Sequence, residues 1–184
     1  MAISIDGTGT IAGITAGGLP DDSITAAELS TKTFVSYAAI CDEKGYNVNG
    51  GTFTSGAWRT RDLNTEITDV DGIVSIGSNQ FSLGAGNYLI EWLAPGYHVN
   101  RHFARLQNIT SGTTDGLSAV MYANSTNTVM NVSHGSARVT LTGSTTYEIQ
   151  HRSQTTQADE GFGIGTAVSG TNSRYTVVRI YKEA

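Results

Sequence analysis

The fold is indicated most clearly by one stretch, residues 137–152, which reads ARVTLTGSTTYEIQHR. In its first half, apolar side chains at every second position from Ala137 alternate with polar ones, and the half that begins at Tyr147 repeats this pattern. A period of two is typical of strands with one buried face. Gly143 and Ser144, between the halves, are turn-forming residues. The stretch therefore predicts two half-buried antiparallel strands separated by a turn.

The same period continues through residues 33–184. Further strands are expected over Phe34–Cys41, Thr52–Leu63, Gly72–Gly77, Asn79–Leu83, Asn87–Leu93, His102–Ile109, Leu117–Ala123, Val129–Ser133 and Tyr175–Lys182. Glycine-rich turn signals separate most of these runs, and no helical period is visible among them. About ten short strands at this spacing predict one all-β domain, a sandwich or a barrel.

Residues 1–32 differ from the rest of the chain. The first thirty positions contain four acidic residues and no basic one, and they have too few apolar side chains to form a core. Thr25 and Glu28 have the spacing of a capping box, in which each side chain binds a free amide of the other residue. We therefore expect an extended N-terminal connector with a short helix, ordered by contact with other chains.

The composition argues against two broad classes of function. Charged residues make up 15% of the chain and the pI is about 5.2, so we expect no basic surface for binding nucleic acid. No apolar run approaches the ~20 residues that a membrane-spanning helix needs, so we expect no membrane insertion. The chain is nevertheless 39% hydrophobic, which is enough to form a folded core.

Candidate metal ligands are few and poorly spaced. Cys41 is the only cysteine, so no thiolate zinc site or intrachain disulfide can form, and we expect a small buried side chain there. On one strand, His98 and His102 would lie about 13 Å apart, too far for one ion. The run Asp69 to Gly72 resembles the start of a calcium loop without its later ligands, which favours a turn. We predict no metal and no cofactor.

No catalytic site is predicted either. His151 shares the inward side of its strand with Tyr147, and Arg101 or Arg105 is a candidate neighbour for it, but no nucleophile motif accompanies it. A glycosidase would need two carboxyl groups about 5–10 Å apart. The candidate carboxylates fall mostly in turns or on polar strand faces, and they are Asp62, Glu66, Asp69, Asp71, Glu91 and Glu148.

Several motifs, in their order along the chain, resemble known families. The run Phe81–Ile90 and the closing run Tyr175–Tyr181 resemble strands of the C1q/TNF-like jelly roll. The run Thr52–Asn64, which reads TFTSGAWRTRDLN, is similar to a stretch in the tail-fibre tip domains of bacteriophages. Residues 100–106 and 149–152 also resemble these tips, and residues 3–11 and 17–21 resemble the connectors that precede them. The resemblance implies a jelly-roll sandwich that associates as a homotrimer.

Two sets of side chains follow from this resemblance as candidates. If the terminal strands line the three-fold axis as in the family, the trimer interface includes Phe34 or Tyr37 and Tyr175 or Tyr181. A glycan site combines aromatic rings with amides and arginines. Candidate receptor-binding residues are Trp58, Tyr97, Asn100 and Arg101, with Phe162 in a glycine-rich loop.

The resemblance implies a non-enzymatic virion appendage, assembled in the host cytoplasm and exposed on the particle. We expect a tail-fibre tip that recognises a host-surface glycan or outer protein, with residues 1–30 bound to another virion protein. Two alternatives remain open. One is a capsid head-fibre or decoration protein anchored by residues 1–30, and the other is a small polysaccharide depolymerase.

Overall fold

The described part of the chain is all-β, as the sequence predicts. The computed structural model describes residues 33–168 and 170–184, so the connector and the short helix expected in residues 1–32 lie outside the described residues. In the described residues no helix is long and apolar enough to cross a membrane. The strands are β1 (Phe34–Lys44), β2 (Arg59–Thr60), β3 (Thr65–Asp69), β4 (Val74–Gly77), β5 (Gln80–Leu83), β6 (Gly86–Tyr97), β7 (Asn100–Asn108), β8 (Thr114–Leu117), β9 (Met121–Ala123), β10 (Met130–Leu141), β11 (Thr145–Ser153) and β12 (Ser173–Glu183).

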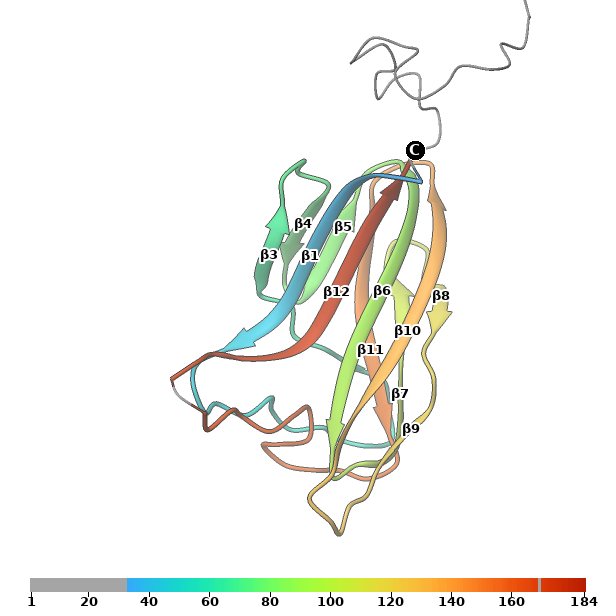
Figure 1. Ribbon diagram of the computed structural model, residues 1–184. Coiled ribbons are helices and arrows are strands. Elements are labelled where there is room, and N and C mark those ends of the chain that lie inside the picture. The colour runs from blue at the N-terminus through green and yellow to red at the C-terminus, as the bar shows by residue number, and fades with distance from the viewer. Residues whose placement is uncertain (1–32, 169) are drawn as a thin grey trace, which may run out of the picture. The chain divides into compact units, whose positions relative to one another are not determined.

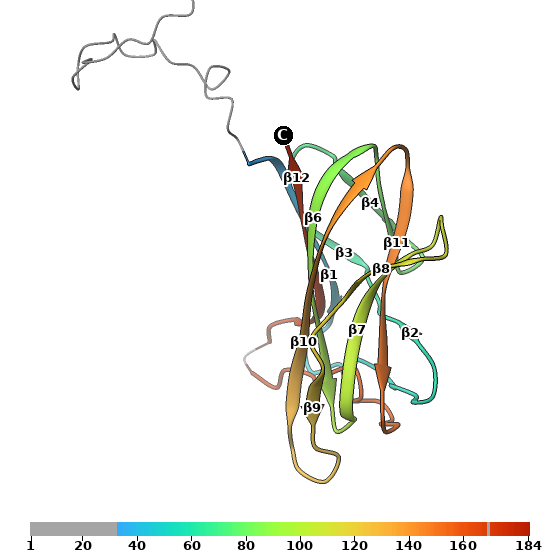
Figure 2. The same cartoon turned by 90° about the vertical axis from the view of Figure 1, so that its right-hand side faces the viewer.

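These strands form two antiparallel sheets that face each other, as Figures 1 and 2 show from two sides. Sheet I has the strand order β10-β6-β12-β1-β3. Sheet II has the order β4-β5-β11-β7-β8, with β2 paired to β11 and β9 paired to β7. The first and last described strands, β1 and β12, pair with each other from Phe34–Glu183 to Lys44–Ser173. Most neighbours in a sheet are thus distant in sequence, which is the topology of a jelly roll.

The stretch 137–152 connects the two sheets. Its first half is the end of β10, which pairs with β6 in sheet I, and its second half lies in β11, which pairs with β7 and β5 in sheet II. The turn at Gly143 and Ser144 therefore crosses from one layer to the other. Both strands bury one face, as predicted, but they do not pair with each other.

The core lies between the sheets and is built from alternate residues of both. Trp92 is fully buried on β6, and its indole lies directly over Gly135, its register partner on β10, where any side chain would collide with the ring. The larger buried side chains around it are Ile40, Phe81, Tyr88, Ile90, Leu106, Tyr147, Ile149, Val178 and Ile180. Burying each of them contributes roughly 1.5–3 kcal/mol, so the period of two in the sequence encodes the sandwich directly.

Three expectations about strands differ in the structure. The run Thr52–Leu63 is mostly irregular: only Arg59–Thr60 is a strand, while Phe53 forms an isolated bridge with Gln157. The run Leu117–Ala123 is divided between the end of β8 and β9, which both pair with β7. In the first case Phe53 and Leu63 are buried from a loop, which produces strand-like alternation without a strand. The expected strand Val129–Ser133 is not separate, because β10 continues from Met130 through the first half of the stretch 137–152 to Leu141.

Candidate interaction surfaces

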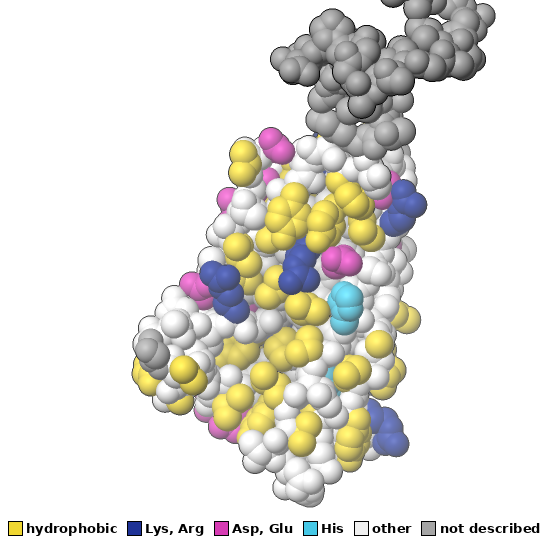
Figure 3. Space-filling model, in the orientation of Figure 1, with side chains coloured by type: hydrophobic (Ala, Val, Ile, Leu, Met, Phe, Trp, Pro, Cys, Tyr) yellow, Lys and Arg dark blue, Asp and Glu magenta, His cyan; other side chains and the backbone are white. Residues whose placement is uncertain are grey.

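The outward side of sheet I is unusually apolar. Residues that alternate with the core on its strands point away from sheet II, and they include exposed aromatic side chains. Phe34 is 40% and Tyr37 is 39% exposed, and the rings of both lie about 5 Å from the ring of Tyr181 (5.2 and 5.0 Å). Figure 3 shows hydrophobic side chains gathered over this sheet, with few charges among them. We call this the apolar face, defined by Phe34, Tyr37, Leu89, Leu93, Val132, Val177 and Tyr181.

Tyr175 does not contribute to the apolar face, although alternation along β12 places it on the same side of the strand as Tyr181. It is only 5% exposed, and its hydroxyl donates a hydrogen bond to the carbonyl of Val48. The loop that contains Gly163 also packs directly on its ring. Loops of the same chain therefore cover Tyr175, whereas Phe34, Tyr37 and Tyr181 remain available.

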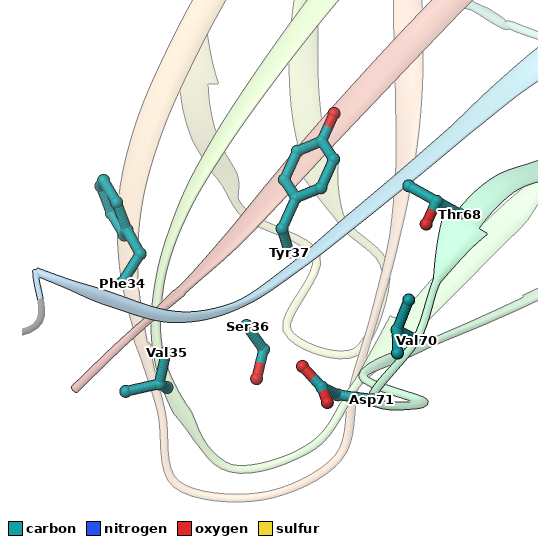
Figure 4. Close-up of a pocket in the computed structure, with 7 residues that line it drawn as sticks. All are labelled: Phe34, Val35, Ser36, Tyr37, Thr68, Val70 and Asp71. Carbon is teal, nitrogen blue, oxygen red and sulfur yellow. The ribbon is translucent and has the colours of Figure 1, made fainter. Parts of the chain in front are cut away.

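A shallow groove of about 350 Å³ lies at the edge of the apolar face (Figure 4). Residues 34–37 of β1 line one side, and Thr68, Val70 and Asp71 line the other. Val70 is 90% exposed. The carboxylate of Asp69 accepts hydrogen bonds from the amides of Ile73 and Val74, so this acidic run is organised as a turn. No cluster of metal-binding side chains occurs among the residues that the structure describes.

The predicted receptor-binding residues fall in two places. Asn100 and Arg101 begin β7, where the side chain of Asn100 donates to Thr155 and that of Arg101 donates to Gln154. Trp58, in the irregular run before β2, packs farther along β7, with its ring 5.0 Å from Phe103 and 4.2 Å from the guanidinium carbon of Arg105. Of these three residues Arg101 is exposed, whereas Asn100 and Trp58 are half-buried.

Tyr97 and Phe162 do not present rings at a free tip. Tyr97 is 5% exposed and stacks on the imidazole of His98 at 4.0 Å. Phe162 packs 4.5 Å from Phe53 and lies beneath the guanidinium of Arg61 at 4.1 Å. Both rings therefore support the end of the sandwich from inside, and a ligand there would meet the polar loop residues.

The outward side of sheet II is polar and internally hydrogen-bonded. The guanidinium of Arg105 donates to Gln150 at 2.8 and 2.5 Å and to Thr114 at 2.9 Å. Gln150 and Gln80 both donate to the carboxylate of Glu148, which is 7% exposed. The alternation of Glu148 and Gln150 with buried Tyr147 and Ile149 indicated a polar face, but it did not predict this network across the four strands β5, β11, β7 and β8.

Two histidines and an arginine are buried together at one end of the sandwich. His102 and His151 are each 0% exposed, and a hydrogen bond of 2.9 Å joins Nδ1 of His102 to Nε2 of His151. Burial, with a smaller contribution from the charge of Arg61, lowers the pKa of His102 to about 4 and that of His151 well below its usual value. Arg101 and Arg105, the expected neighbours, do not face this cluster. They alternate with His102 along β7 and therefore point outward.

Arg61 is the buried cation of this cluster. Its guanidinium donates to the hydroxyl of Thr176 at 2.6 Å and to the carbonyls of Pro95 and Phe162 at 3.2 and 2.9 Å. Burial lowers its pKa to about 10, partly offset by the charges of Asp42 and Asp62. The residue thus connects the loop after β2, strands β6 and β12, and the Phe162 loop, which is a structural role.

Several candidate carboxylates already have partners in the same chain. Asp62 binds Lys44 at 2.7 Å and Asn79 at 3.1 Å. Asp69 caps its own turn, and Glu148 belongs to the network on sheet II. None of these three residues is aimed at an open cleft, so their geometry favours structural roles.

Comparison with known proteins supports the fold and does not supply a family. No protein-family model matches the sequence, and no curated protein matches it either. Among solved structures, the globular domain of zebrafish complement 1qA protein superposes with a TM-score of 0.52 at 13% identity, covering 80% of this chain and 97% of that chain. Murine APRIL at pH 5.0 gives 0.52 at 9% identity, covering 80% of this chain and 98% of that chain.

A third similar structure is that of a vertex protein. PRD1 vertex protein P5 superposes with a TM-score of 0.51 at 11% identity, covering 82% of this chain and 99% of that chain. The described residues therefore form a C1q/TNF-like jelly roll, the class that their two sheets define. At these identities the similarity concerns the fold alone.

Proposed function

We propose that this chain is a non-enzymatic, homotrimeric bacteriophage virion appendage that carries a host-recognition surface. The observation that carries the proposal is the apolar face on a C1q/TNF-like jelly roll. Soluble monomers rarely expose a contiguous apolar patch of this kind. Three copies related by rotation would bury it, because a closed heterologous ring hides the same surface of every copy.

The virion assignment is supported by the sequence resemblance to tail-fibre tips and by the structural similarity to PRD1 vertex protein P5. A tail-fibre tip is the function that we favour, because the run TFTSGAWRTRDLN of residues 52–64 belongs to that resemblance.

A capsid head-fibre or decoration protein, with residues 1–30 bound to the shell, is the second candidate. It is favoured by the similarity to P5, because P5 is a vertex protein. Locating the chain on the particle by gold-labelled antibody separates the two.

The proposed ligand surface is the outward side of sheet II together with the loops at the start of β7. There Trp58, Asn100 and Arg101 lie beside further amides and hydroxyls, the groups that bind sugars. Tyr97 and Phe162 would support this surface from beneath. The apolar face cannot serve the same purpose, because the trimer would cover it.

The test of assembly is sedimentation equilibrium of the full chain. A homotrimer is expected at three times 19.4 kDa, and a stable monomer at micromolar concentration contradicts the proposal. For recognition, the labelled chain is incubated with cells of the strain that the parent particle infects. Arg101→Ala should reduce binding, whereas Arg174→Ala, which removes an exposed arginine paired with Glu43, should not.

A further inference from the structure

Two opposite charges lie in the middle of the apolar face. Glu91 on β6 and Arg179 on β12 are register partners on adjacent strands. Each alternates with fully buried core residues, so each side chain points away from sheet II. Their half-buried apolar neighbours on this face are Leu89, Leu93, Val177 and Tyr181. On β10, the exposed Ser136 lies opposite Glu91 and the exposed His134 lies opposite Leu93.

Glu91 and Arg179 form no ion pair within residues 33–168 and 170–184. The ion pairs described there join Lys44 to Asp42 and Asp62, Arg138 to Glu183, and Arg174 to Glu43. Glu91 and Arg179 both lie near the hydroxyl of Tyr181: burial, the negative charge of Glu91 and a hydrogen bond to Glu91 raise the pKa of Tyr181, whereas the positive charge of Arg179 lowers it. Both charges are therefore held at this surface without an opposite charge in contact among the described residues.

Covering this face has a consequence for both groups. Any molecule that buries the apolar face removes water from Glu91 and Arg179, and an unpaired buried charge is strongly destabilising. A purely apolar partner would supply an opposite charge to neither residue, and an acidic or basic peptide would supply one to only one of them. A second copy of this chain brings one charge of each sign, so it complements the face completely.

We infer that Glu91 of one copy pairs with Arg179 of the next copy in the homotrimer. This inference rests on the proposed function. Under three-fold rotation the same contact repeats between each pair of neighbours, which gives three equivalent ion pairs inside an apolar interface. Apolar contacts slide easily, so these pairs would fix the register and the trimeric closure of the assembly.

The experiment reverses each charge and measures assembly of the full chain by sedimentation and native mass spectrometry. Glu91→Arg and Arg179→Glu should each raise the trimer dissociation constant on the order of a hundredfold or more, because each places like charges together. An equimolar mixture of the two variants should recover trimers of mixed composition in part, because in each mixed trimer opposite charges meet at two of the three contacts between copies and like charges meet at the third. The double variant that carries both reversals should assemble close to the wild-type level.

The matched control is Arg152→Glu, a reversal of an exposed charge on the outward side of sheet II, which should leave assembly unchanged. If the wild-type chain forms trimers and the two reversals do not weaken them, the inference is wrong while the proposed function stands. Rescue by the double variant without rescue by mixing would place the ion pair within one copy and also overturn the inference. A wild-type chain that never associates overturns both.

Milder variants keep the test decisive if a reversal prevents folding. Glu91→Gln and Arg179→Gln remove one charge each and nearly preserve size. If the two residues pair in the trimer, the double substitution should weaken assembly by less than the product of the two single effects. Effects that multiply independently would contradict the pairing.

Discussion

Nδ1 of His102 lies 2.9 Å from Nε2 of His151, and both imidazoles are fully buried. One ring must donate the proton and the other must accept it, so at least one of the two facing nitrogens is unprotonated. The other ring nitrogens, Nε2 of His102 and Nδ1 of His151, have no hydrogen-bond partner in the described residues. A second proton on either imidazole would therefore add a positive charge beside Arg61 without a counter-ion in contact.

The first prediction is that stability falls as pH decreases below about 6.5. The pKa of both histidines is lowered in the folded state, so between 6.5 and about 4 the unfolded chain binds protons that the folded chain does not. His102 alone should cost about 3 kcal/mol of unfolding free energy across this interval, at ~1.4 kcal/mol per pH unit. Urea unfolding at pH 7, 5.5 and 4, at one protein concentration, measures it.

The control for this pH dependence is His134, which is exposed in the protomer; because it lies opposite Leu93 on the apolar face, unfolding is compared at a protein concentration at which the chain is monomeric. His134→Gln should keep the slope of stability against pH, whereas His151→Gln should reduce it. Equal stability at pH 7 and pH 4 in the wild-type chain would contradict the prediction.

The second prediction concerns Arg61. Arg61→Leu should lower the unfolding free energy by about 3 kcal/mol, because it leaves the buried carbonyls of Pro95 and Phe162 and the hydroxyl of Thr176 without their donor. Arg59, which is half-buried and donates only to the carbonyl of Thr54 among the described residues, is the comparison. Arg59→Leu should cost less than about 1 kcal/mol, and similar losses for both would argue against this role of Arg61. Thermal and urea unfolding give the values.

The third prediction tests the contact between Trp92 and Gly135. A methyl group at Gly135 would collide with the buried indole, so Gly135→Ala should cost about 1–3 kcal/mol through overpacking. Gly143→Ala is the matched change, because a Cβ at Gly143 meets no atom within 4 Å. It should be neutral within ~0.5 kcal/mol. Chemical unfolding compares them, and a tolerated Gly135→Ala would mean that Trp92 can move aside.

The fourth prediction separates two tyrosines of β12. Tyr181→Ala should weaken trimer assembly, because it removes a ring of the apolar face, and should affect the stability of the protomer much less. Tyr175→Phe should do the reverse: assembly is kept, and stability falls by about 1 kcal/mol through loss of the hydrogen bond to Val48. Sedimentation measures the assembly of both variants, and chemical unfolding measures the stability of their protomers. Loss of assembly in Tyr175→Phe alone would contradict this assignment.

Much of the sandwich could be predicted from alternation alone, because a period of two in the sequence indicates which side chains of a strand are buried. It does not state which strands are partners. The halves of residues 137–152 are consecutive strands, yet β10 joins sheet I and β11 joins sheet II. Alternation also misled over residues 52–63, where Phe53 is buried from an irregular loop.

The candidate sites were less predictable, because they depend on what covers each side chain. Sequence order determined by itself that Tyr175 and Tyr181 share one side of a strand, and that His151 points inward. Only the tertiary structure decided that loops of the same chain bury Tyr175, and that His102 and Arg61 are the neighbours of His151. Strand parity is a local property of the backbone, whereas burial and pairing depend on segments more than forty residues away.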